Sequence, residues 1–434
     1  MKVNELFSVK SERLFERLCE LDHLEEAFKR VKKNKGSEGI DGISINSFEE
    51  SLGEQLAQLS TELLNWSYKP MPVRRVEIPK PGSKEPRKLG VPAIRDRVMQ
   101  TGIKMLLEPE LDPTFSGNSY GFRPGRSQRD AIERAAKIVK SGKEYIVDID
   151  LSKFFDRVNH DRLIGNLSKV VRDKRILRLI GLTLRSGVLE EGKFISTPEG
   201  TTQGSPLSPL LSNFVLDELD KELERRGLEF CRWADDCNIF VKSARSGERV
   251  LKGISRFIKE KLKLEVNWNK TKVAKSRGVK FLGFTVVRGH VAISQGALNS
   301  ARLKLKELIP RGSHLPIEKT IEKYNEWYLG WWNYFKVSRY PNQFRRIEAH
   351  ARRRMRSRII GASKRKRFLV KKLRRQGTSK NAAFKTVYSP RGRWRLSNTR
   401  VLNNAFNIMW FRRRGMLIKS EQRLEHWFHV KRWA

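Results

Sequence analysis

Two adjacent carboxylates are the first feature of this sequence that could do chemistry. Asp235 and Asp236 lie between two short apolar runs of β-forming residues, in CRWADDCNIF, which predicts a hairpin with the pair near its bend. Neighbouring negative charges repel one another, and a cation between them relieves that repulsion. The pair is therefore either a solvated turn or a site for a hard divalent ion such as Mg²⁺, which binds carboxylates together with substrate phosphates. The second interpretation predicts a third carboxylate elsewhere in the chain.

A second acidic stretch, EYIVDID, provides that carboxylate. Side chains alternate along a strand, so Asp148 and Asp150 share one face, and Asp150 stands where the predicted strand ends. Side chains at such a position point out of the sheet into a cleft, whereas Asp148 lies deeper and is the weaker candidate. An aspartate at a strand end and an aspartate pair at a hairpin bend resemble the palm of nucleic-acid polymerases. There, an antiparallel sheet holds them around two metal ions that activate the attacking 3′-hydroxyl and stabilise the leaving pyrophosphate.

The elements that must position these acids alternate between helical and strand periodicity. Apolar residues at i, i+3 and i+4 predict helices over most of the N-terminal segment, and a hairpin with Pro-Gly at its turn follows over residues 73–92. Further helices are predicted over residues 128–140 and from Ser152 onward, after the strand that carries Asp150. From about Gln295 the pattern becomes helical and basic. The order predicts an α+β body followed by a helical extension, with a boundary near Ser294.

The chain is strongly basic. Its 434 residues include 90 Lys and Arg against 48 Asp and Glu, which gives a formal net charge of +42 and a pI near 10.5. Such an excess destabilises a compact chain by self-repulsion unless a polyanion neutralises it, so nucleic acid is the expected partner. Residues 351–434 alone contain about 26 basic and about 2 acidic residues. Aromatic residues among these cations favour a folded nucleic-acid-binding module over a disordered tail. They are Trp394, Trp410, Phe411, Trp427, Phe428 and Trp433.

Cysteine usage and hydropathy narrow the class of protein further. The three cysteines, Cys19, Cys231 and Cys237, show no CxxC spacing, which predicts reduced thiols in an intracellular protein and no structural zinc site. The N-terminus lacks the apolar core of a signal peptide, and no run of about 18 apolar residues occurs. We therefore expect a cytoplasmic, nucleic-acid-associated protein with no membrane partner.

An ordered series of motifs resembles those of the group II intron reverse transcriptases, also called intron-encoded maturases. The resemblance covers nearly the whole chain. The motifs occur in family order as NKGSEGIDG, IPKPGSKEPRKLGVPAIRDRVMQ, YGFRPGRS, VDIDLSKFFDRVNHD, TPEGTTQGSPLSPLLSN, RWADD, VKFLGF, YLGWWNYF and SPRGRWRLSNTRVLNNAFN. One such motif would be weak evidence, but the ordered series is strong.

The resemblance implies a right-hand polymerase fold and two activities. Residues 1–294 would form fingers and palm with an N-terminal extension, residues 295–365 a helical thumb or maturase domain, and residues 366–434 a basic nucleic-acid-binding region. The implied activities are RNA-directed DNA polymerisation with two Mg²⁺ ions and binding of intron RNA, which promotes splicing and intron mobility. The implied partners are intron RNA, an RNA template with a DNA primer, dNTPs and a DNA target. No HNH endonuclease segment is expected, because the sequence shows no Cys- or His-rich C-terminal stretch.

The resemblance also implies roles for individual residues. Asp150, Asp235 and Asp236 would be the catalytic metal ligands, with the backbone of Leu151 near a metal. The incoming nucleotide would be bound by Lys80, Arg87, Phe155 and Gln203, with Phe155 excluding a 2′-hydroxyl by steric contact. Lys and Arg suit the triphosphate as a point charge and a bidentate fork. Gly204, Trp233 and Lys270 would line the pocket or contact the template-primer. Arg123, within the GFRPG element, would either touch the template or hold the fold. Gly204 would let backbone approach the template-primer closely, and Lys270 would protonate pyrophosphate.

One departure from the family and several alternatives stay open. Trp233 stands where most relatives carry Tyr, which adds bulk and removes a hydroxyl next to the metal-binding acids. The protein could be a domesticated intron-like reverse transcriptase in DNA repair or defence, or a non-enzymatic RNA-binding splicing factor. Intact acids argue against the second of these. A metal nuclease would use similar carboxylates, but it needs neither a nucleotide-gating Phe nor triphosphate-binding fingers.

Overall fold

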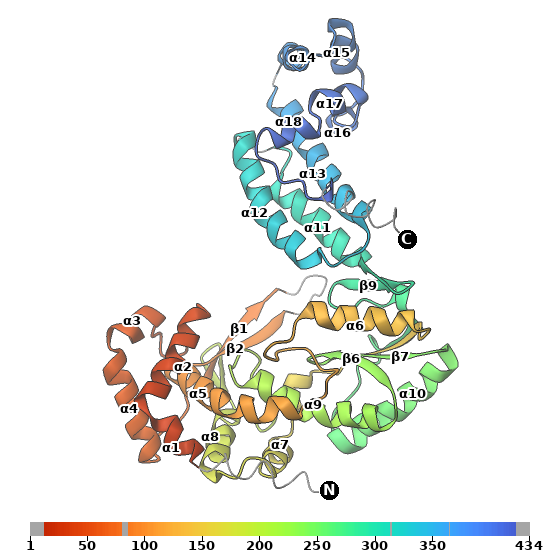
Figure 1. Ribbon diagram of the computed structural model, residues 1–434. Coiled ribbons are helices and arrows are strands. Elements are labelled where there is room, and N and C mark those ends of the chain that lie inside the picture. Colours follow the sequence, from red (N-terminus) through yellow and green to blue (C-terminus); the bar gives the residue numbers. More distant parts are fainter. Residues whose placement is uncertain (1–12, 80–85, 313–314, 364, 422–434) are drawn as a thin grey trace. The chain divides into compact units, whose positions relative to one another are not determined.

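The computed structural model describes residues 13–79, 86–312, 315–363 and 365–421. The chain divides into two compact units, each of which is described by itself. The N-terminal unit comprises residues 1–138 and 142–275, and the C-terminal unit comprises residues 139–141 and 276–434. Helices and sheets are mixed, as the predicted α+β class requires (Figure 1).

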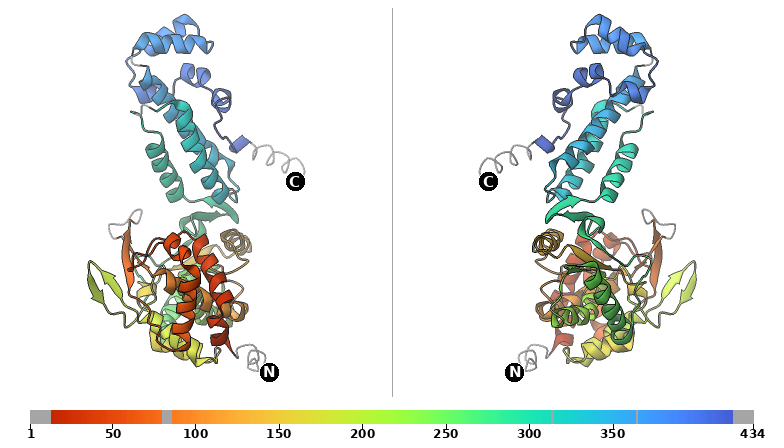
Figure 2. Two further views of the ribbon diagram at one scale, coloured as in Figure 1. Left: turned by 90° about the vertical axis from the view of Figure 1, so that its left-hand side faces the viewer. Right: turned by 90° about the vertical axis from the view of Figure 1, so that its right-hand side faces the viewer.

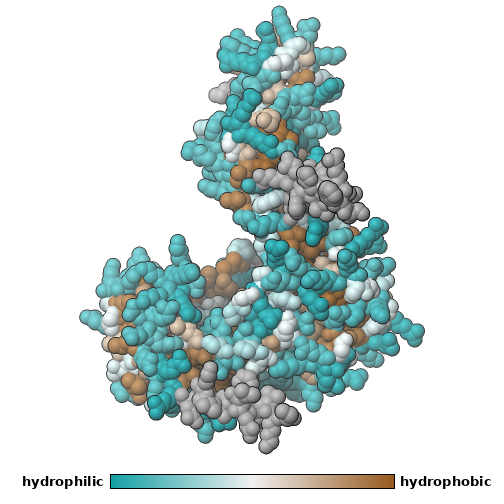
Figure 3. All heavy atoms as spheres, viewed as in Figure 1, coloured by the Kyte–Doolittle hydropathy of each residue, from teal (hydrophilic) through white to brown (hydrophobic). Residues whose placement is uncertain are grey.

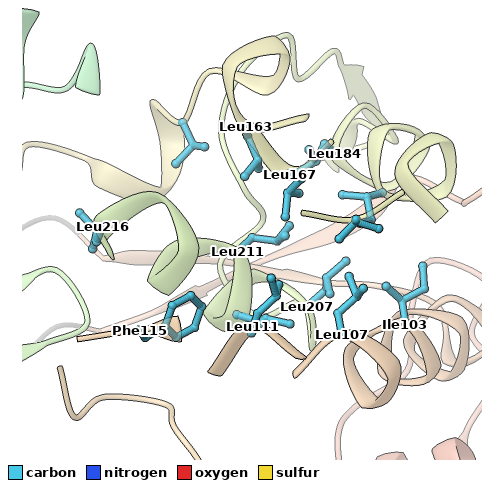
Figure 4. Close-up of a cluster of buried hydrophobic side chains, with 14 of the residues drawn as sticks. Ile103, Leu107, Leu111, Phe115, Leu163, Leu167, Leu184, Leu207, Leu211 and Leu216 are labelled. Atoms are coloured by element: carbon cyan, nitrogen blue, oxygen red, sulfur yellow. The ribbon is translucent and has the colours of Figure 1, made fainter. Parts of the chain in front are cut away.

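α-Helices are the most abundant secondary structure in the described part of the N-terminal unit. Their bounds are α1 Leu14–Cys19, α2 Leu21–Lys33, α3 Ile45–Glu50, α4 Leu52–Leu64, α5 Ile94–Leu111, α6 Gln128–Lys140, α7 His160–Leu167, α8 Lys174–Leu184, α9 Ser208–Arg225 and α10 Ala244–Phe257. A π-helical turn, Ile258–Leu262, extends α10. Helices α5, α7, α8 and α9 bury leucine-rich faces against one another, and Figure 4 shows Leu107, Leu163 and Leu211 pointing into this shared core. The same hydrophobic core extends to buried residues of the second sheet described below.

The first sheet contains the predicted hairpin. Strands β1 (Val73–Ile78) and β2 (Arg87–Val91) pair antiparallel, and β1 also pairs in parallel with β4 (Val188–Glu190), which is followed by β5 (Lys193–Ile195). The Pro-Gly turn between β1 and β2 lies outside the described residues. The hairpin prediction is confirmed for its two strands.

The second sheet carries the acidic residues. Its order is β6-β7-β3-β8, and every pair is antiparallel. The strands are β3 Tyr145–Ile149, β6 Glu229–Trp233, β7 Asp236–Val241 and β8 Lys272–Lys275. Val147, Ile149 and Ile239 belong to the main hydrophobic core, and α10 packs on this sheet. The alternation predicted for the strand before Asp150 is therefore confirmed, because Val147 and Ile149 face the core.

The C-terminal unit begins with a short hairpin, β9 (Phe284–Val287) and β10 (His290–Ile293), and is then helical. Its helices are α11 Gln295–Leu308, α12 Ile317–Phe335, α13 Pro341–Ala362, α14 Lys366–Arg375, α15 Lys380–Val387, α16 Arg393–Leu396, α17 Arg400–Ala405 and α18 Ile408–Arg412. Helices α11, α12 and α13 run side by side (Figures 1 and 2). The basic segment up to residue 421 is folded, as its aromatic content predicts, whereas Trp427, Phe428 and Trp433 lie outside the described residues.

Aromatic side chains hold this helical bundle together. On α12, Tyr324 and Tyr328 are fully buried and stacked with centroids 5.1 Å apart, and Trp332 packs on Phe344 of α13 at 4.6 Å. On the face shown in Figure 3, hydrophilic side chains predominate over most of the surface. Within the described part of the chain, no helix is both long and apolar enough to cross a membrane.

Candidate active site

Strand register brings the three predicted metal ligands to one end of the second sheet. Ile149 pairs with Cys237, so Asp150 and Asp236 are the next opposed positions of β3 and β7. Trp233 pairs with Asp236, so the β6–β7 hairpin closes through only Ala234 and Asp235, with Ala234 in the left-handed region at φ 55°. Two adjacent strands and one tight turn therefore place Asp150, Asp235 and Asp236 together.

Lys270 approaches Asp150 from the other side of β3. The β3–β8 register, in which Asp148 pairs with Lys272, continues to place Lys270 beside Asp150. The ammonium of Lys270 lies 3.2 Å from Oδ1 and 3.1 Å from Oδ2 of that carboxylate, and the Asn267 amide donates to Oδ1 at 3.1 Å. A cation thus already contacts the Asp150 carboxylate.

The electrostatics of the site favour a positive ligand. Burial raises the pKa of Asp235, and the nearby Asp150 carboxylate raises it further, while Lys270 and Arg87 oppose this increase. Burial likewise raises the pKa of Asp148 to about 6, with a further increase from Asp150. Carboxylates that resist ionisation because of burial and mutual repulsion are stabilised when a divalent cation binds between them.

The donor set suits Mg²⁺ chemically, although the side chains are not arranged around an ion. Among the described residues, no three carboxylate, imidazole or thiolate groups form a ready metal cluster. The donors that converge here are carboxylate oxygens, which are the ligands that Mg²⁺ prefers. Leu151, whose backbone is a further predicted contact, is buried and bridges to Val266. A metal ion would have to displace the Lys270 ammonium from Asp150.

A buried arginine, Arg232, which was not predicted from the sequence, forms hydrogen bonds that hold the turn carrying Asp235. Arg232 on β6 is completely buried and pairs with the completely buried Asp220 of α9, through Nε to Oδ1 at 2.7 Å and Nη2 to Oδ2 at 2.5 Å. Its Nη1 donates to the Ala234 carbonyl at 2.9 Å and to Oδ1 of Asn213 at 3.0 Å. The only available sequence signal was a charged residue within an apolar strand.

The predicted nucleotide-binding residues lie on three different loops or strands. Lys80 falls outside the described residues. Arg87 begins β2, is exposed, and acts electrostatically on Asp235. Phe154 is buried while Phe155 is only half-buried, so Phe155 is the one available to a ligand. Gln203 is half-buried, and its carbonyl accepts from the Gly90 amide at 2.8 Å.

Contacts within the protein explain why position 204 requires glycine and which groups Arg123 binds. Gly204 has φ 118°, and a Cβ there would lie 2.5 Å from the Gly90 carbonyl oxygen, so the close approach is to β2. Arg123 is buried and donates from all three nitrogens to Asp112, Ser116 and Ser119. Its five N–H groups are thereby satisfied. These contacts favour a fold-stabilising role for Arg123 over template contact.

The loop after Asp150 differs from the sequence-based prediction. The helix expected from Ser152 begins only at His160, because residues 154–156 form a 3₁₀ turn and Asn159 caps α7. The buried His160 ring forms a hydrogen bond with the Gly200 carbonyl at 2.6 Å, which connects this loop to the loop that carries Gln203.

Trp233 is the last residue of β6 and is half-buried. The backbone of Gly121 packs closely against it, because a Cβ on Gly121 would lie 3.3 Å from the Trp233 Cα. The three cysteines are buried and unpaired.

Comparison with known proteins identifies the class of protein to which this chain belongs. Residues 78–286 match the family described as "Reverse transcriptase (RNA-dependent DNA polymerase)", and residues 298–377 match "Group II intron, maturase-specific domain". The first match contains all three aspartates. The chain is therefore a reverse transcriptase with a maturase-specific domain, and such polymerase domains generally use divalent metal ions.

Named relatives specify the family. Protein YkfC of Escherichia coli is 32% identical over 322 residues, which are 65% of this chain and 84% of YkfC. The group II intron-encoded protein LtrA of Lactococcus lactis is 34% identical over 53% of this chain, but over only 37% of its own length. The solved "Partial Cas6-RT-Cas1--Cas2 complex" shares 27% identity over 57% of this chain and 42% of that one, with a TM-score of 0.38. The chain belongs to the group II intron reverse transcriptases and maturases.

Proposed function

We propose that this protein extends a DNA primer on an RNA template, using two Mg²⁺ ions bound by Asp150, Asp235 and Asp236. The observation that carries this proposal is the strand register that brings these three carboxylates to one end of a sheet. Bound there, the ions would lower the pKa of the attacking 3′-hydroxyl and neutralise charge on the leaving pyrophosphate. The buried Arg232 network holds the turn that carries Asp235.

Other residues of this unit bind and select the nucleotide in this proposal. Arg87, with Lys80, contacts the triphosphate from the β1–β2 hairpin, and Phe155 and Gln203 line the sugar and base side of the pocket. Phe155 rejects a 2′-hydroxyl by contact, which selects deoxynucleotides. Lys270 leaves Asp150 when metal binds and is then free to donate a proton to the leaving pyrophosphate.

Primer extension tests the polymerase assignment directly. With Mg²⁺ and dNTPs, Asp235→Asn should reduce extension of a DNA primer on an RNA template by more than about a hundredfold, because metal ligation supplies several kcal/mol. Asp156→Asn is the matched control, since Asp156 is exposed and outside the triad. Equal activity of the Asp235 variant and the control would refute the assignment of the metal ligands.

Discrimination between deoxynucleotides and ribonucleotides tests the proposed role of Phe155 separately. Phe155→Ala should raise incorporation of ribonucleotides relative to deoxynucleotides by about tenfold or more, as expected when a single apolar contact sets discrimination. Phe155→Tyr keeps the bulk of the ring and should retain the selection. If the alanine variant selected deoxynucleotides as strongly as wild type, a residue other than Phe155 would exclude the 2′-hydroxyl.

The second proposed activity is intron RNA binding by the C-terminal unit. Residues 295–365 are proposed as thumb or maturase domain and residues 366–434 as the basic binding region, with intron RNA and a DNA target as partners. The concentrated positive charge supports this proposal. Binding that releases counterions should weaken steeply with salt. RNA binding that persists in Asp235→Asn would separate this activity from polymerisation, and RNA binding without any extension in the wild type would favour the splicing-factor alternative.

A further inference from the structure

A cavity of about 460 Å³ lies entirely within the C-terminal unit. The start of α12, the end of α13, α14, and the segment from Phe406 through α18 line it. Its volume falls in the range of small-molecule and cofactor sites. None of the residues discussed for polymerisation lines it.

Arg358 on α13 lines this cavity as a buried cation without an acceptor. The side chain is 3% exposed, and within the described chain its Nη1 and Nη2 have no hydrogen-bond partner. Neighbouring buried arginines on α13 differ, because Arg354 donates to the Ile309 carbonyl and Arg356 donates to the Ser397 carbonyl. Burial lowers the pKa of Arg358, as expected for a charge removed from water without a counter-ion. An unpaired buried charge destabilises a fold, and an acceptor supplied by a ligand would remove that cost.

Trp410 on α18 adds a second unsatisfied donor. Its indole Nε1 is buried and has no acceptor among the described residues. The ring packs edge-on against Phe406 with centroids 4.9 Å apart, and the Arg414 guanidinium lies 3.6 Å from the centre of its face. Both unsatisfied buried groups of this cavity are therefore donors, and they lie next to aromatic and aliphatic side chains. A matching ligand presents acceptors on a flat, largely apolar body.

Charge around the cavity favours an anion. Lys372, Arg375 and Arg414 line it together with a single carboxylate, Glu318, which Arg414 approaches at 3.7 Å. A nucleotide combines a flat base that carries acceptors with a phosphate that such cations neutralise. Peptide ligands with an acidic side chain supply the charge but lack the flat acceptor edge.

We propose that this cavity binds one unpaired nucleotide of a structured RNA, with the base against Trp410 and Arg358 and the phosphate near Lys372 and Arg375. The proposal rests on the proposed RNA binding by this unit and names the feature of the RNA that is recognised. Guanine is favoured, because its O6 and N7 accept two hydrogen bonds from one arginine. Adenine presents an amino donor at the O6 position, which would oppose the guanidinium.

Binding of RNA hairpins with one bulged nucleotide tests this inference. The full chain is titrated at raised ionic strength with hairpins that carry a bulged G, a bulged A or no bulge. Wild type should bind the bulged G about tenfold more tightly than the other two, which is the scale of one bidentate base contact. Arg358→Met should abolish this preference, and Trp410→Phe should reduce it while keeping a ring in place. Arg395→Met is the matched control, since Arg395 is exposed and does not line the cavity.

A stability measurement separates recognition from folding. Arg358→Met removes an unpaired buried charge and keeps an unbranched side chain, so its melting temperature should rise while its preference for guanine disappears. A lower melting temperature, or a preference that persists in this variant, would overturn the inference. Tight binding of all three hairpins by wild type would overturn it as well, while leaving the proposed RNA binding intact. Weak binding of all three would remove the proposed RNA partner itself, and primer extension by the same preparation would show whether the polymerase assignment survives independently.

Discussion

The Arg232–Asp220 pair allows the proposed positioning of Asp235 to be tested separately from the stability of the fold. Both side chains are completely buried, and Arg232 makes hydrogen bonds to Asp220, Asn213 and the Ala234 carbonyl. Burial opposes the charge on Arg232, but the Asp220 carboxylate outweighs that effect and raises the pKa of the guanidinium. Arg232→Met leaves a buried carboxylate uncompensated, and the expected loss in free energy of unfolding is about 3 to 5 kcal/mol.

The double variant Arg232→Met/Asp220→Leu should behave differently. It replaces the pair with apolar side chains of similar size, which is often neutral for stability or stabilising. The Ala234 carbonyl and the Asn213 amide oxygen nevertheless lose their donor, so the turn that carries Asp235 is less firmly held. Because displacement of a catalytic group by about 1 Å can reduce turnover a hundredfold, kcat should stay about tenfold to a hundredfold below wild type.

Two measurements on the same proteins decide this prediction. Denaturant unfolding gives the free energy of unfolding, and primer extension at saturating template and dNTP gives kcat. Arg226→Met is the control, because Arg226 pairs with Glu222 near the surface and its loss should change stability by at most about 1 kcal/mol. If the double variant regained both stability and wild-type kcat, Arg232 would support only the fold, and the inference that it positions Asp235 would be refuted.

Metal affinity, backbone strain and the pH dependence of stability can each be probed with a single substitution. Lys270→Met removes the ammonium that competes for the Asp150 carboxylate, so the Mg²⁺ concentration for half-maximal extension should fall, and an unchanged or higher midpoint in a Mg²⁺ titration would contradict this. Gly204→Ala forces a side chain into a left-handed backbone and against the Gly90 carbonyl, which should lower the free energy of unfolding by about 1 to 3 kcal/mol in denaturant titrations. Burial raises the pKa of Asp96 from 3.8 to about 6, so the folded state holds this proton more tightly than the unfolded state. Stability should therefore decrease by on the order of 3 kcal/mol as pH rises through that interval, and Asp96→Asn should flatten this part of the unfolding profile.

The strands and the β6–β7 hairpin could be predicted because they depend on local patterns. Alternation in EYIVDID and the apolar flanks of the Asp235 turn specify which side chains face the core, and the structure confirms both. Residue contacts across long sequence separations could not be predicted in the same way. Arg232 meets an acid on a preceding helix, and only the folded arrangement of α9 against β6 shows that Asp220 faces it.

The wrong helix prediction after Asp150 has a similar physical origin. Residues 152–159 have apolar positions that suit a helix, but backbone carbonyls there accept hydrogen bonds from the loop before α9. The Phe155 carbonyl accepts from the Thr201 amide, and the Val158 carbonyl accepts from the Gly200 amide at 2.8 Å. A continuous helix would have used these carbonyls internally. Tertiary hydrogen bonds therefore override local periodicity at the loop that presents Phe155.

The two activities rest on interactions that respond differently to salt. The aspartates are positioned by strand pairing and by a completely buried ion pair, which ions in solution barely screen. The proposed RNA binding would instead depend on the many exposed cations of the C-terminal unit, whose contribution falls steeply as counterions are added. Rising salt should therefore first increase the template concentration required for extension, while kcat at saturating template stays nearly constant. A parallel fall in both quantities would mean that the cations also position the reacting groups, and that binding and chemistry are not separable in this chain.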